Sequence, residues 1–410
     1  MRLDAVRAAL DRRLDPASPA PLAVGFSGGG DSLFLLKTVL DWARPHGRPV
    51  LALVVDHGLQ ADSPRWTADA VAQAQRLGAQ AQALTWTGDK PTAGVPAAAR
   101  RARHALLADA ARAAGARVLA LGHTASDLAE GAAMRSQGST VSDPRQWAPS
   151  PVWPEGRDVF LLRPLLTLGR EEIRQALTAE GETWLDDPAN DDLRYARARA
   201  RAAGADTVEV QAVTSRAAPA FAVDAAGAIR LTREVAASPL AAALLCAAGT
   251  ERPPRGERLE RLVQRIRSGE TFAATLSGAR VEAAEVVLVC RDAGETARGG
   301  LAPLSLAPGE TGVWDGRWEV TAGTRPLGVE ALKGKVPTLP PGQRANLPAI
   351  AASARPALPL LHGEGTEPRC PALDGPEFAA DGEGRARLLV LDRFEAAIGL
   401  RDRERATNTS

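Results

Sequence analysis

Short apolar runs alternate with longer stretches of helical periodicity in the first half of the chain. The apolar runs predict buried strands at 22–26, 50–55, 80–86, 118–121 and 159–162. Between and around them, apolar residues recur at helical spacing and predict helices at 3–14, 33–40, 63–77, 97–114, 125–135 and 168–180. Strands that alternate with helices in this way are typical of an α/β fold, an open parallel sheet with helices on both faces.

This alternation stops between residues 205 and 220. We therefore expect two domains, an α/β domain at 1–212 and a smaller α+β region at 213–410. In the second region, a helix with an apolar stripe is flanked by Arg258, Arg261 and Arg265, and strands are expected at 271–276 and 280–289. The segment 136–158 is rich in proline and reads as an irregular loop in which Trp147 and Trp153 are exposed.

Composition narrows the class of protein. The chain has 410 residues and a formal net charge of +1, so bulk attraction to nucleic acid is not indicated, although local arginine patches remain candidates for RNA contact. The three cysteines, Cys246, Cys290 and Cys370, form neither a disulfide framework nor a CxxC pair. No apolar run is long enough to cross a bilayer and no signal peptide is apparent, so we expect a cytoplasmic protein.

A glycine-rich hexad between the first strand and its helix carries the clearest chemistry: Ser27, Gly28, Gly29, Gly30, Asp31 and Ser32. Three glycines expose main-chain N–H groups at a helix N-terminus, which is a favourable place for phosphate groups. Asp31 would repel phosphates unless a cation lay between them, so the hexad predicts Mg²⁺ together with a nucleotide. The less specific interpretation is an ordinary glycine turn between strand and helix.

Other polar residues follow the carboxyl ends of predicted strands, where ligands bind in open sheets. Asp56 and His57 follow the second strand and His123 follows the fourth, although a structural histidine remains the alternative for each. Arg100 and Arg103 share a helix face that would suit phosphates, or would simply be solvated. Asp127 and Glu130 are three residues apart near the start of a helix, where they would bind a cation or favour the helix dipole.

The hexad lacks the lysine of the Walker motif and the spacing of the dinucleotide fold. It resembles the SGGxDS signature of the PP-loop ATP pyrophosphatases. The order of this and the following motifs along residues 22–201 resembles the tRNA(Ile)-lysidine synthetase family. The matching residues are the hexad, Asp56-His57-Gly58, Arg100 with Arg103, Gly122-His123 with Asp127 and Glu130, Arg163-Pro164-Leu165-Leu166 with Arg170, and Trp184 to Asn190 with Arg197.

The resemblance implies an ATP-dependent ligase that forms a carbon–nitrogen bond. The partners would be ATP, Mg²⁺, L-lysine and an isoleucine tRNA with a CAU anticodon, whose first anticodon cytidine is adenylated at its C2 oxygen and then attacked by lysine. A homodimer is possible. The implied catalytic residues are Asp31, Asp127, Glu130 and Arg197, the metal ligands Asp31, Asp127 and Glu130, the ATP-binding residues 27–32 with Asp56 and His57, and the phosphate-binding residues Arg100, Arg103 and His123.

Further expectations concern the second step and the substrate pocket. Glu130 would deprotonate or orient the lysine amine. The loop at 144–154 would form a wall of the pocket for a flipped cytosine. The arginines beside the apolar stripe of the second region would contact tRNA phosphates.

The sequence also departs from the family pattern after the fourth strand. Thr124, Ser126, Leu128 and Gly131 stand where the family usually has other residues, which leaves metal coordination open. Two other functions therefore stay in view. One is another PP-loop tRNA-modifying enzyme such as a thiolase, which would use cysteines near the nucleotide. The other is a tRNA-binding protein whose catalysis has decayed.

Overall fold

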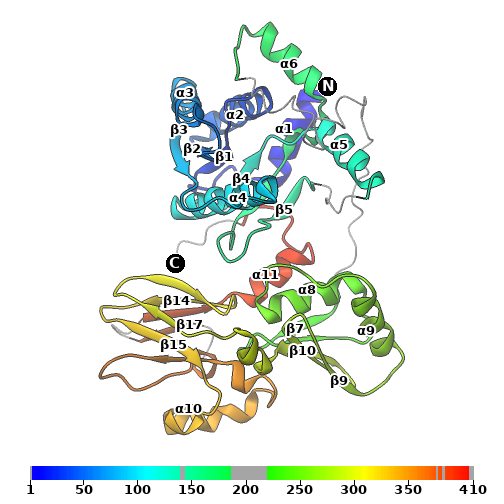
Figure 1. The fold of residues 1–410 in the computed structure, drawn as a ribbon, viewed down its shortest axis with the longest axis vertical. Coiled ribbons are helices and arrows are strands. Elements are labelled where there is room, and N and C mark those ends of the chain that lie inside the picture. Colours follow the sequence, from blue (N-terminus) through cyan, green and yellow to red (C-terminus); the bar gives the residue numbers. More distant parts are fainter. Residues whose placement is uncertain (1, 139–143, 186–218, 375–376, 381–383, 406–410) are drawn as a thin grey trace. The chain divides into compact units, whose positions relative to one another are not determined.

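The computed structural model describes residues 2–138, 144–185, 219–374, 377–380 and 384–405. The chain forms two compact units, one made of residues 1–215 with 401–410 and the other of residues 216–400. Figure 1 shows both units. The expected boundary between residues 212 and 213 lies outside the described residues. Within the described ranges, no helix has the length and apolarity needed to cross a membrane.

The first unit contains a six-stranded sheet of order β3-β2-β1-β4-β6-β5. Every neighbouring pair is parallel except β5 with β6. The strands are β1 (Leu22–Gly25), β2 (Val50–Asp56), β3 (Gln80–Thr85), β4 (Val118–Leu121), β5 (Trp147–Pro149) and β6 (Phe160–Leu162). The predicted open parallel sheet is confirmed. Strand order reverses between β1 and β4, where open sheets bind ligands.

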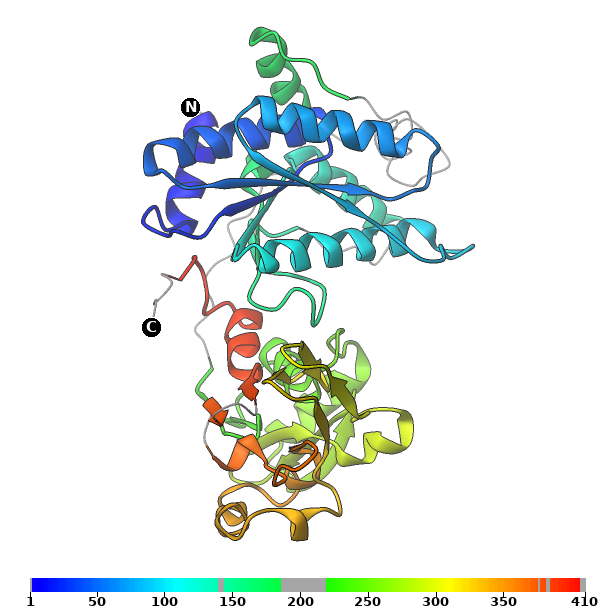
Figure 2. The same cartoon turned by 90° about the vertical axis from the view of Figure 1, so that its left-hand side faces the viewer.

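Helices cover both faces of this sheet. They are α1 (Arg2–Arg13), α2 (Gly30–Ala43), α3 (Ser63–Arg76), α4 (Val95–Ala113), α5 (Ala125–Ser136) and α6 (Arg170–Ala179), with 3₁₀ turns η1 (Arg44–His46) and η2 (Pro164–Thr167). Successive strand residues point to opposite faces. Leu22 and Val24 of β1 therefore join the core beneath α2 and α3, whereas Ala23 joins a second core beneath α4, which is cyan in Figure 2.

The segment after α5 is more ordered than the sequence predicts. Trp147 opens the edge strand β5 and is half-buried, so the prediction that it is exposed is wrong, and Trp153 is half-buried too. The indole of Trp147 stacks on Phe160 at 4.9 Å between ring centroids, and its Nε1 donates to the carbonyl of Arg401 at 2.8 Å. Apolar contact and a satisfied indole N–H explain why this residue leaves solvent.

The last described residues pack with the first unit, which the sequence reading did not anticipate. Both Glu404 and Arg48 have fully buried side chains, joined by two bonds of 2.5 and 2.7 Å. Arg48 also donates to the carbonyls of Ala20 and Asp15, and Glu404 accepts from the Asp15 N–H. Each charge is thus compensated and hydrogen-bonded inside the protein, as buried ion pairs require.

The second unit is a smaller α+β structure, as predicted. It has a sheet of order β7-β8-β11-β10-β9, a three-stranded sheet β12-β15-β16 and a four-stranded sheet β13-β14-β18-β17. The strands are β7 (Phe221–Val223), β8 (Ile229–Leu231), β9 (Phe272–Leu276), β10 (Ala279–Ala283), β11 (Val287–Arg291), β12 (Leu304–Leu306), β13 (Thr311–Trp314), β14 (Trp318–Ala322), β15 (Leu327–Ala331), β16 (Pro359–His362), β17 (Glu377–Ala380) and β18 (Gly384–Leu388).

The helices of the second unit are α8 (Ala237–Ala248), α9 (Glu257–Arg267), α10 (Pro341–Asn346) and α11 (Val390–Ala397), with 3₁₀ turns η4 (Ala293–Arg298), η5 (Val336–Thr338), η6 (Leu347–Ala349), η7 (Arg355–Ala357) and η8 (Pro371–Leu373). The predicted strand at 280–289 is wrong in one respect. The chain reverses after Ala283, so that β10 and β11 pair antiparallel, and a pair of strands satisfies backbone groups that one long strand would leave open.

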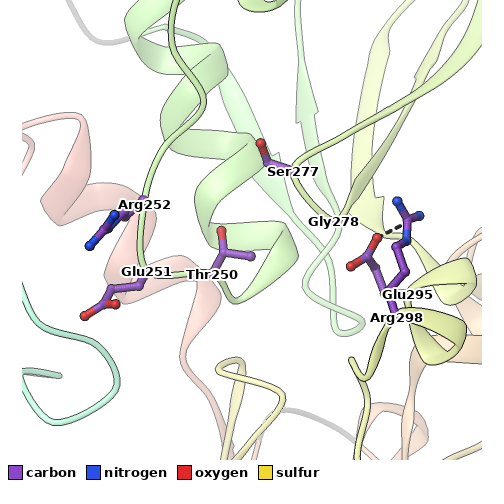
Figure 3. Close-up of a pocket in the computed structure, with 7 residues that line it drawn as sticks. All are labelled: Thr250, Glu251, Arg252, Ser277, Gly278, Glu295 and Arg298. Carbon is purple, nitrogen blue, oxygen red and sulfur yellow. Dashed lines mark ion pairs between the residues drawn. The ribbon is translucent and has the colours of Figure 1, made fainter. Parts of the chain in front are cut away.

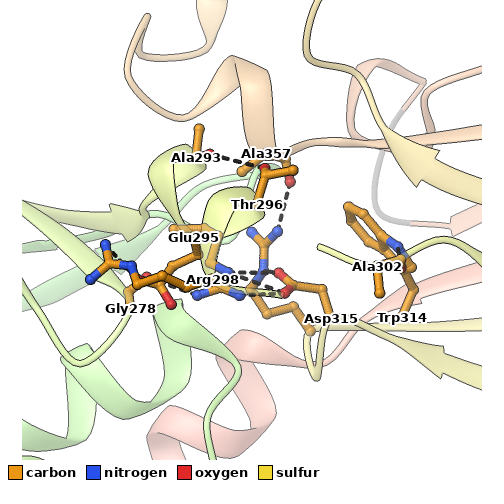
Figure 4. A network of polar contacts seen from close by, with 11 residues as sticks. Gly278, Ala293, Glu295, Thr296, Arg298, Ala302, Trp314, Asp315 and Ala357 are labelled. Atoms are coloured by element: carbon orange, nitrogen blue, oxygen red, sulfur yellow. Dashed lines mark hydrogen bonds and ion pairs between the residues drawn. The ribbon is translucent and has the colours of Figure 1, made fainter. Parts of the chain in front are cut away.

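A buried carboxylate links the sheets of this unit. Asp315, in the turn between β13 and β14, accepts bonds from Arg291 of β11 at 2.6 to 3.1 Å and from Arg317 at 2.8 Å (Figure 4). The Arg317 guanidinium also donates to the carbonyl of Ala357 at 2.6 Å. Because three buried charges share one network, Asp315 fixes how the five-stranded and four-stranded sheets pack.

We predict that Glu404→Gln destabilises the first unit. Removing one charge of a fully buried ion pair leaves Arg48 uncompensated, which should lower the free energy of unfolding by about 3 to 5 kcal/mol. Asp402→Asn is the control, because its side chain is 74% exposed beside Arg13 and should cost less than about 1 kcal/mol. Urea unfolding followed by tryptophan fluorescence measures both. Equal midpoints for the two variants would contradict a stabilising role for the pair.

Candidate active site

The glycine hexad joins β1 to α2, as predicted. Gly28 has a φ of 79°, a conformation that side-chain-bearing residues rarely adopt, and Gly29 precedes the first helical turn in an extended conformation. No side chain caps this end of α2. The N-terminus of α2 therefore presents main-chain N–H groups, and the helix dipole adds partial positive charge there.

Both serine hydroxyls of the hexad bond within the loop. The Ser32 hydroxyl donates to the carbonyl of Gly29 at 2.8 Å and accepts from the Ser27 N–H at 3.2 Å. The two hydroxyl oxygens lie 3.2 Å apart, and because Ser32 already donates its proton, Ser27 is the donor between them. The serines thus hold the loop in shape, and the main-chain N–H groups are the donors presented outward.

A short segment from the far end of α6 packs against the glycine loop. The N–H of Leu185 donates to the carbonyl of Gly28 at 2.9 Å. A Cβ on Gly28 would lie 2.7 Å from Cδ1 of Leu185, and one on Gly30 would lie 3.6 Å from the Trp184 ring. Gly28 is therefore required for two reasons, its positive φ and this close contact.

Gly122 brings the end of β4 against the same loop. A Cβ at this position would lie 3.1 Å from the carbonyl oxygen of Asp31 and 3.3 Å from the Ser32 nitrogen, tighter than most real contacts. Since glycine lacks that atom, the two backbones touch. This contact explains why a glycine precedes His123, and it places α5, which follows directly, beside the hexad.

The three predicted metal ligands, Asp31, Asp127 and Glu130, surround the guanidinium of Arg170. From the sequence alone, Arg170 has no assigned role and is only a residue that matches the family. Arg170, at the start of α6, lies 3.2 Å from Asp31, 3.0 Å from Glu130 and 3.6 Å from Asp127. The carboxylates come from two elements far apart in the sequence, α2 and α5. Their side chains are at most 23% exposed, so this cluster is largely shielded from water.

Residues that depart from the family pattern support this cluster. Thr124 is fully buried and caps α5, where its N–H and hydroxyl donate to one oxygen of Asp127 at 2.9 and 3.1 Å. The hydroxyl of Ser126 accepts from the N–H of Arg170 at 3.2 Å. Leu128 and Gly131 are buried in α5. Asp127 therefore has a capping role, as the less specific interpretation held, and its other oxygen faces Arg170.

The environment of Asp31 opposes its ionisation. Burial raises its pKa, an effect that Arg170 counteracts and the Asp127 carboxylate reinforces. The ionised Asp31 therefore costs folding free energy at neutral pH, and a cation beside it would recover that cost. A partly exposed carboxylate whose pKa is raised beside other charged groups is a candidate for a functional residue.

Basic residues and histidines gather after β4, after β6 and on α4. Nε of Arg163 donates to Nδ1 of His123 at 3.3 Å, which makes Nε2 the protonated nitrogen of a neutral His123 ring. Burial lowers the pKa of Arg163 to about 10, and Arg100 contributes. His104 of α4 is 4% exposed, and burial together with Arg103, Arg100, Arg163 and His123 lowers its pKa to about 2.

Further polar residues lie at and after the end of β2, near the arginines of α4. Asp56 accepts a bond from the N–H of Gly58 at 2.8 Å, so its carboxylate shapes the turn. His57 lies edge-on to Trp86 at 6.4 Å, and burial, with Arg103, lowers its pKa. Lys90, which sequence reasoning missed, lies over the Trp86 ring at 5.1 Å and donates to its carbonyl.

The structure thus brings together the hexad, Asp127 and Glu130, and it places Arg100, Arg103, His123 and His57 within one electrostatic neighbourhood. Arg197 lies outside the described residues. Sequence reasoning missed the roles of Arg170, Arg163 and His104. The motif Arg163-Pro164-Leu165-Leu166 with Arg170 was the available signal, but its arginines were not assigned to a site.

Carboxylate oxygens are the donors that Mg²⁺ prefers. Among the described residues, no three His, Cys, Asp or Glu side chains are arranged to enclose a metal ion. Mg²⁺ is usually held by one or two carboxylates and substrate phosphates rather than by a protein cage. Asp31, beside the phosphate-binding loop, fits that mode in donor type and position.

A pocket of about 510 Å³ lies in the second unit (Figure 3). Its lining residues are Thr250, Glu251, Arg252, Ser277, Gly278, Glu295 and Arg298. Two of its four charged lining residues, Glu295 and Arg298, pair with each other at 2.8 Å. None of the predicted site residues lines it, so the hexad remains the candidate site.

A family model described as the PP-loop domain matches residues 3–205. A tRNA(Ile)-lysidine synthase from Caulobacter vibrioides is 70% identical over 408 residues, 99% of this chain and all of that relative. The chain belongs to the tRNA(Ile)-lysidine synthase family. A relative of the same name from Hyphomonas neptunium is 38% identical over 315 residues, covering 68% of this chain and 83% of its own.

Among solved structures, a U34-tRNA thiolase from Methanococcus maripaludis matches with a TM-score of 0.41 and 16% identity, covering 49% of this chain and 71% of that one. Membership of the tRNA(Ile)-lysidine synthase family rests on the sequence relatives. It confirms the recognition made from the hexad and the ordered motifs.

We predict that Gly28→Ala abolishes ATP binding by this family member while the fold persists. The added Cβ meets Leu185 and the φ of 79° becomes strained, so the loop must change shape. Gly115→Ala is a matched control, because Gly115 has a φ of 78° and open space around its Cβ position. Calorimetric titration with ATP measures both. Undiminished affinity in Gly28→Ala would show that the loop does not bind the phosphates.

A second prediction concerns His104 and acid. Because its pKa is lowered from 6.5 to about 2, the folded state keeps His104 neutral and the unfolded state binds a proton below pH 6.5. Acidification from pH 7 to 5 should cost about 2 kcal/mol of stability through this residue. His104→Gln should lose that part of the pH dependence, whereas the exposed His46→Gln should keep it. Identical pH slopes for His104→Gln and the unmodified protein would contradict the prediction.

Proposed function

We propose that this protein ligates L-lysine to C2 of the cytidine at the first anticodon position of an isoleucine tRNA with a CAU anticodon, at the expense of ATP. The observation that carries the proposal is the acidic cluster that meets the uncapped glycine loop, in a chain 70% identical along its length to a tRNA(Ile)-lysidine synthase. The product is lysidine, and the by-products are pyrophosphate and AMP.

The first step activates the cytidine. Its C2 oxygen attacks the α-phosphorus of ATP, an oxygen–phosphorus bond forms, and the bond to the leaving pyrophosphate breaks. The N–H groups at the start of α2 hold the phosphates, and Asp31 is the residue that would hold Mg²⁺ against them. Bound Mg²⁺ would neutralise charge that develops on the leaving group.

In this mechanism, Arg100, Arg103 and His123 bind the anionic groups of the substrates. Arg100 and Arg103 of α4 supply positive charge next to His57 and His104. His123, held by Arg163 with a proton on Nε2, donates that proton in a hydrogen bond to a phosphate oxygen. His104 of α4 and His57, which follows β2, stay neutral at pH 7 because their pKa values are lowered, so the arginines carry the positive charge.

The second step consumes lysine. Its ε-amine attacks C2, the carbon–oxygen bond breaks, and AMP leaves with that oxygen. Glu130, whose side chain is 2% exposed beside Arg170, accepts a proton from the amine or orients it. Acidic groups at this place favour a cationic substrate, since the cluster has three carboxylates for one guanidinium. Arg197 remains a proposed catalytic residue.

The second unit is proposed to contact tRNA. In α9, Leu259, Leu262, Val263 and Ile266 are buried, and the predicted stripe is confirmed. Arg265 is engaged by Glu270 and by the Phe272 ring at 4.0 Å. Arg258 is exposed and Arg261 makes only an exposed pair with Glu257, so these two suit phosphate contact. A wall of the cytosine pocket at 144–154, a homodimer and a cytoplasmic location stay predictions.

The thiolase alternative is weakened by the cysteines. All three lie buried in the second unit, and burial raises the pKa of Cys246 and of Cys370 to about 12 and that of Cys290 to about 11. Such thiols do not form the thiolate that sulfur transfer needs. A decayed tRNA-binding protein would have no reason to keep Asp31 in an environment that opposes its charge.

The test is pyrophosphate release with ATP, Mg²⁺, lysine and the isoleucine tRNA, in the unmodified protein and in Asp31→Asn. We expect release that depends on the tRNA and is lowered about 100-fold or more in the variant. Because the pKa of Asp31 is raised, the neutral asparagine removes an unfavourable charge, so the variant should be no less stable at pH 7.

Asp41→Asn, at an exposed position of the same helix, is the control and should retain full release. Release without any dependence on tRNA, or full release in Asp31→Asn, would contradict the proposal.

A further inference from the structure

Arg170 uses its whole guanidinium on the acidic cluster. Nε faces Asp31 at 3.2 Å, Nη1 faces Glu130 at 3.0 Å and Nη2 faces Asp127 at 3.6 Å. Carboxylates this close to one another repel unless a cation lies among them. Here a side chain of the protein already supplies the cation at the place where the metal was predicted.

The base of Arg170 is fixed to α5. Its N–H donates to Ser126 at 3.2 Å, and the N–H of Ala125 donates to the carbonyl of Leu168 at 2.8 Å. Asp127 and Glu130 are also on α5, so both carboxylates and the guanidinium belong to one local assembly. Asp31 is the exception, because it belongs to α2 and the glycine loop.

Asp31 also differs from Asp127 and Glu130 in its exposure to solvent. Its side chain is 23% exposed, compared with 10% for Asp127 and 2% for Glu130. A cation arriving with phosphates would therefore meet Asp31 first. The bond from Arg170 Nε to Asp31 is the side-chain contact between this assembly and Asp31, and it adds to the backbone contacts of Gly122 and Leu185 with the glycine loop.

We propose that Arg170 is a resident counter-cation that competes with Mg²⁺ for Asp31 and is released from it when the metal binds. The proposal rests on the proposed function in taking Asp31 as the metal-binding carboxylate. Two cations at one carboxylate repel each other, so Arg170 weakens metal binding in the absence of nucleotide. Nucleotide phosphates compensate both charges, and the metal then binds with ATP. The released guanidinium is available to phosphate oxygens, which it matches in shape.

In this proposal Arg170 is a positioning residue, and its presence lowers the affinity of the site for free metal ions. Before ATP arrives it holds three carboxylates together and keeps free metal out. A residue that merely shaped the site for metal would do the opposite, because its loss would weaken metal binding. The sign of the change in metal affinity therefore separates the two roles.

The experiment is a Mn²⁺ titration of the full-length protein without nucleotide, followed by electron paramagnetic resonance of the free ion. We expect Arg170→Met to bind Mn²⁺ at least about tenfold more tightly than the unmodified protein, since a competing positive charge is gone. Arg170→Lys, which keeps the charge, should stay close to the unmodified protein. Arg44→Ala, at an exposed position just after α2, is the control and should change little, because Arg44 is not among the charged groups that shift the pKa of Asp31.

Arg170→Met leaves Glu130 buried without its guanidinium, so a measurement on the unmodified protein accompanies it. Phenylglyoxal modifies exposed arginines, and peptide mass spectrometry gives the rate at Arg170. Mn²⁺ should raise that rate severalfold if the metal displaces the guanidinium. A rate that Mn²⁺ leaves unchanged or lowers, or a folded Arg170→Met with unchanged or weaker Mn²⁺ binding, would overturn the proposal.

These outcomes are independent of the pyrophosphate assay. An active protein with no change in Mn²⁺ affinity in Arg170→Met would refute the competition alone. Tighter Mn²⁺ binding in that variant, combined with no tRNA-dependent pyrophosphate release by the unmodified protein, would refute the proposed function and leave the competition standing.

Discussion

The contact between the backbone of Gly122 and the first turn of α2 is the constraint that places α5 and its acidic residues beside the glycine loop. A Cβ at Gly122 would lie 3.1 Å from the Asp31 carbonyl oxygen, so any larger residue would push the end of β4 and the first turn of α2 apart. Because α5 starts three residues later, its acidic residues reach the glycine loop. The reversal of strand order between β1 and β4 creates the crevice, and this contact sets the distance between its two sides.

The two sides carry opposite charge. On one side, three carboxylates surround Arg170, and negative charge remains after that pairing. On the other side, Arg100, Arg103 and Arg163 lie near histidines that burial keeps neutral. This separation suits a reaction with polyanionic substrates, ATP and tRNA, and a cationic one, lysine. A uniformly charged crevice would repel one partner or the other.

The loop and the sheet could be predicted from the sequence because their signals are local. The hexad, the apolar runs and the helical stripes each occupy a few consecutive residues, and hydrophobic periodicity reports them directly. The spacing of Asp127 and Glu130 suggested a cation site, and the family resemblance assigned both residues to the reaction. A favourable position for Asp127 at a helix N-terminus could also be predicted, since acidic residues are stabilising there in any protein.

What could not be predicted depends on contacts between distant residues. Arg170 meets Asp31 only because α6 packs against α2, and no spacing in the sequence encodes that meeting. The pair of Arg48 and Glu404 joins residues 356 positions apart. Trp147 looked exposed beside prolines, yet Phe160 and the Arg401 carbonyl satisfy both its ring and its N–H. Each case requires the tertiary structure, because partner identity rather than local propensity decides it.

The central claim is that the nucleotide bound at the glycine loop activates the C2 oxygen of the cytidine, so that this oxygen leaves with AMP. The most direct measurement uses an isoleucine tRNA with ¹⁸O at C2 of that cytidine and follows the label by mass spectrometry of the products. The account predicts that AMP carries the label after lysine addition. Unlabelled AMP, with the label in water, in pyrophosphate or still in the nucleoside, would contradict it.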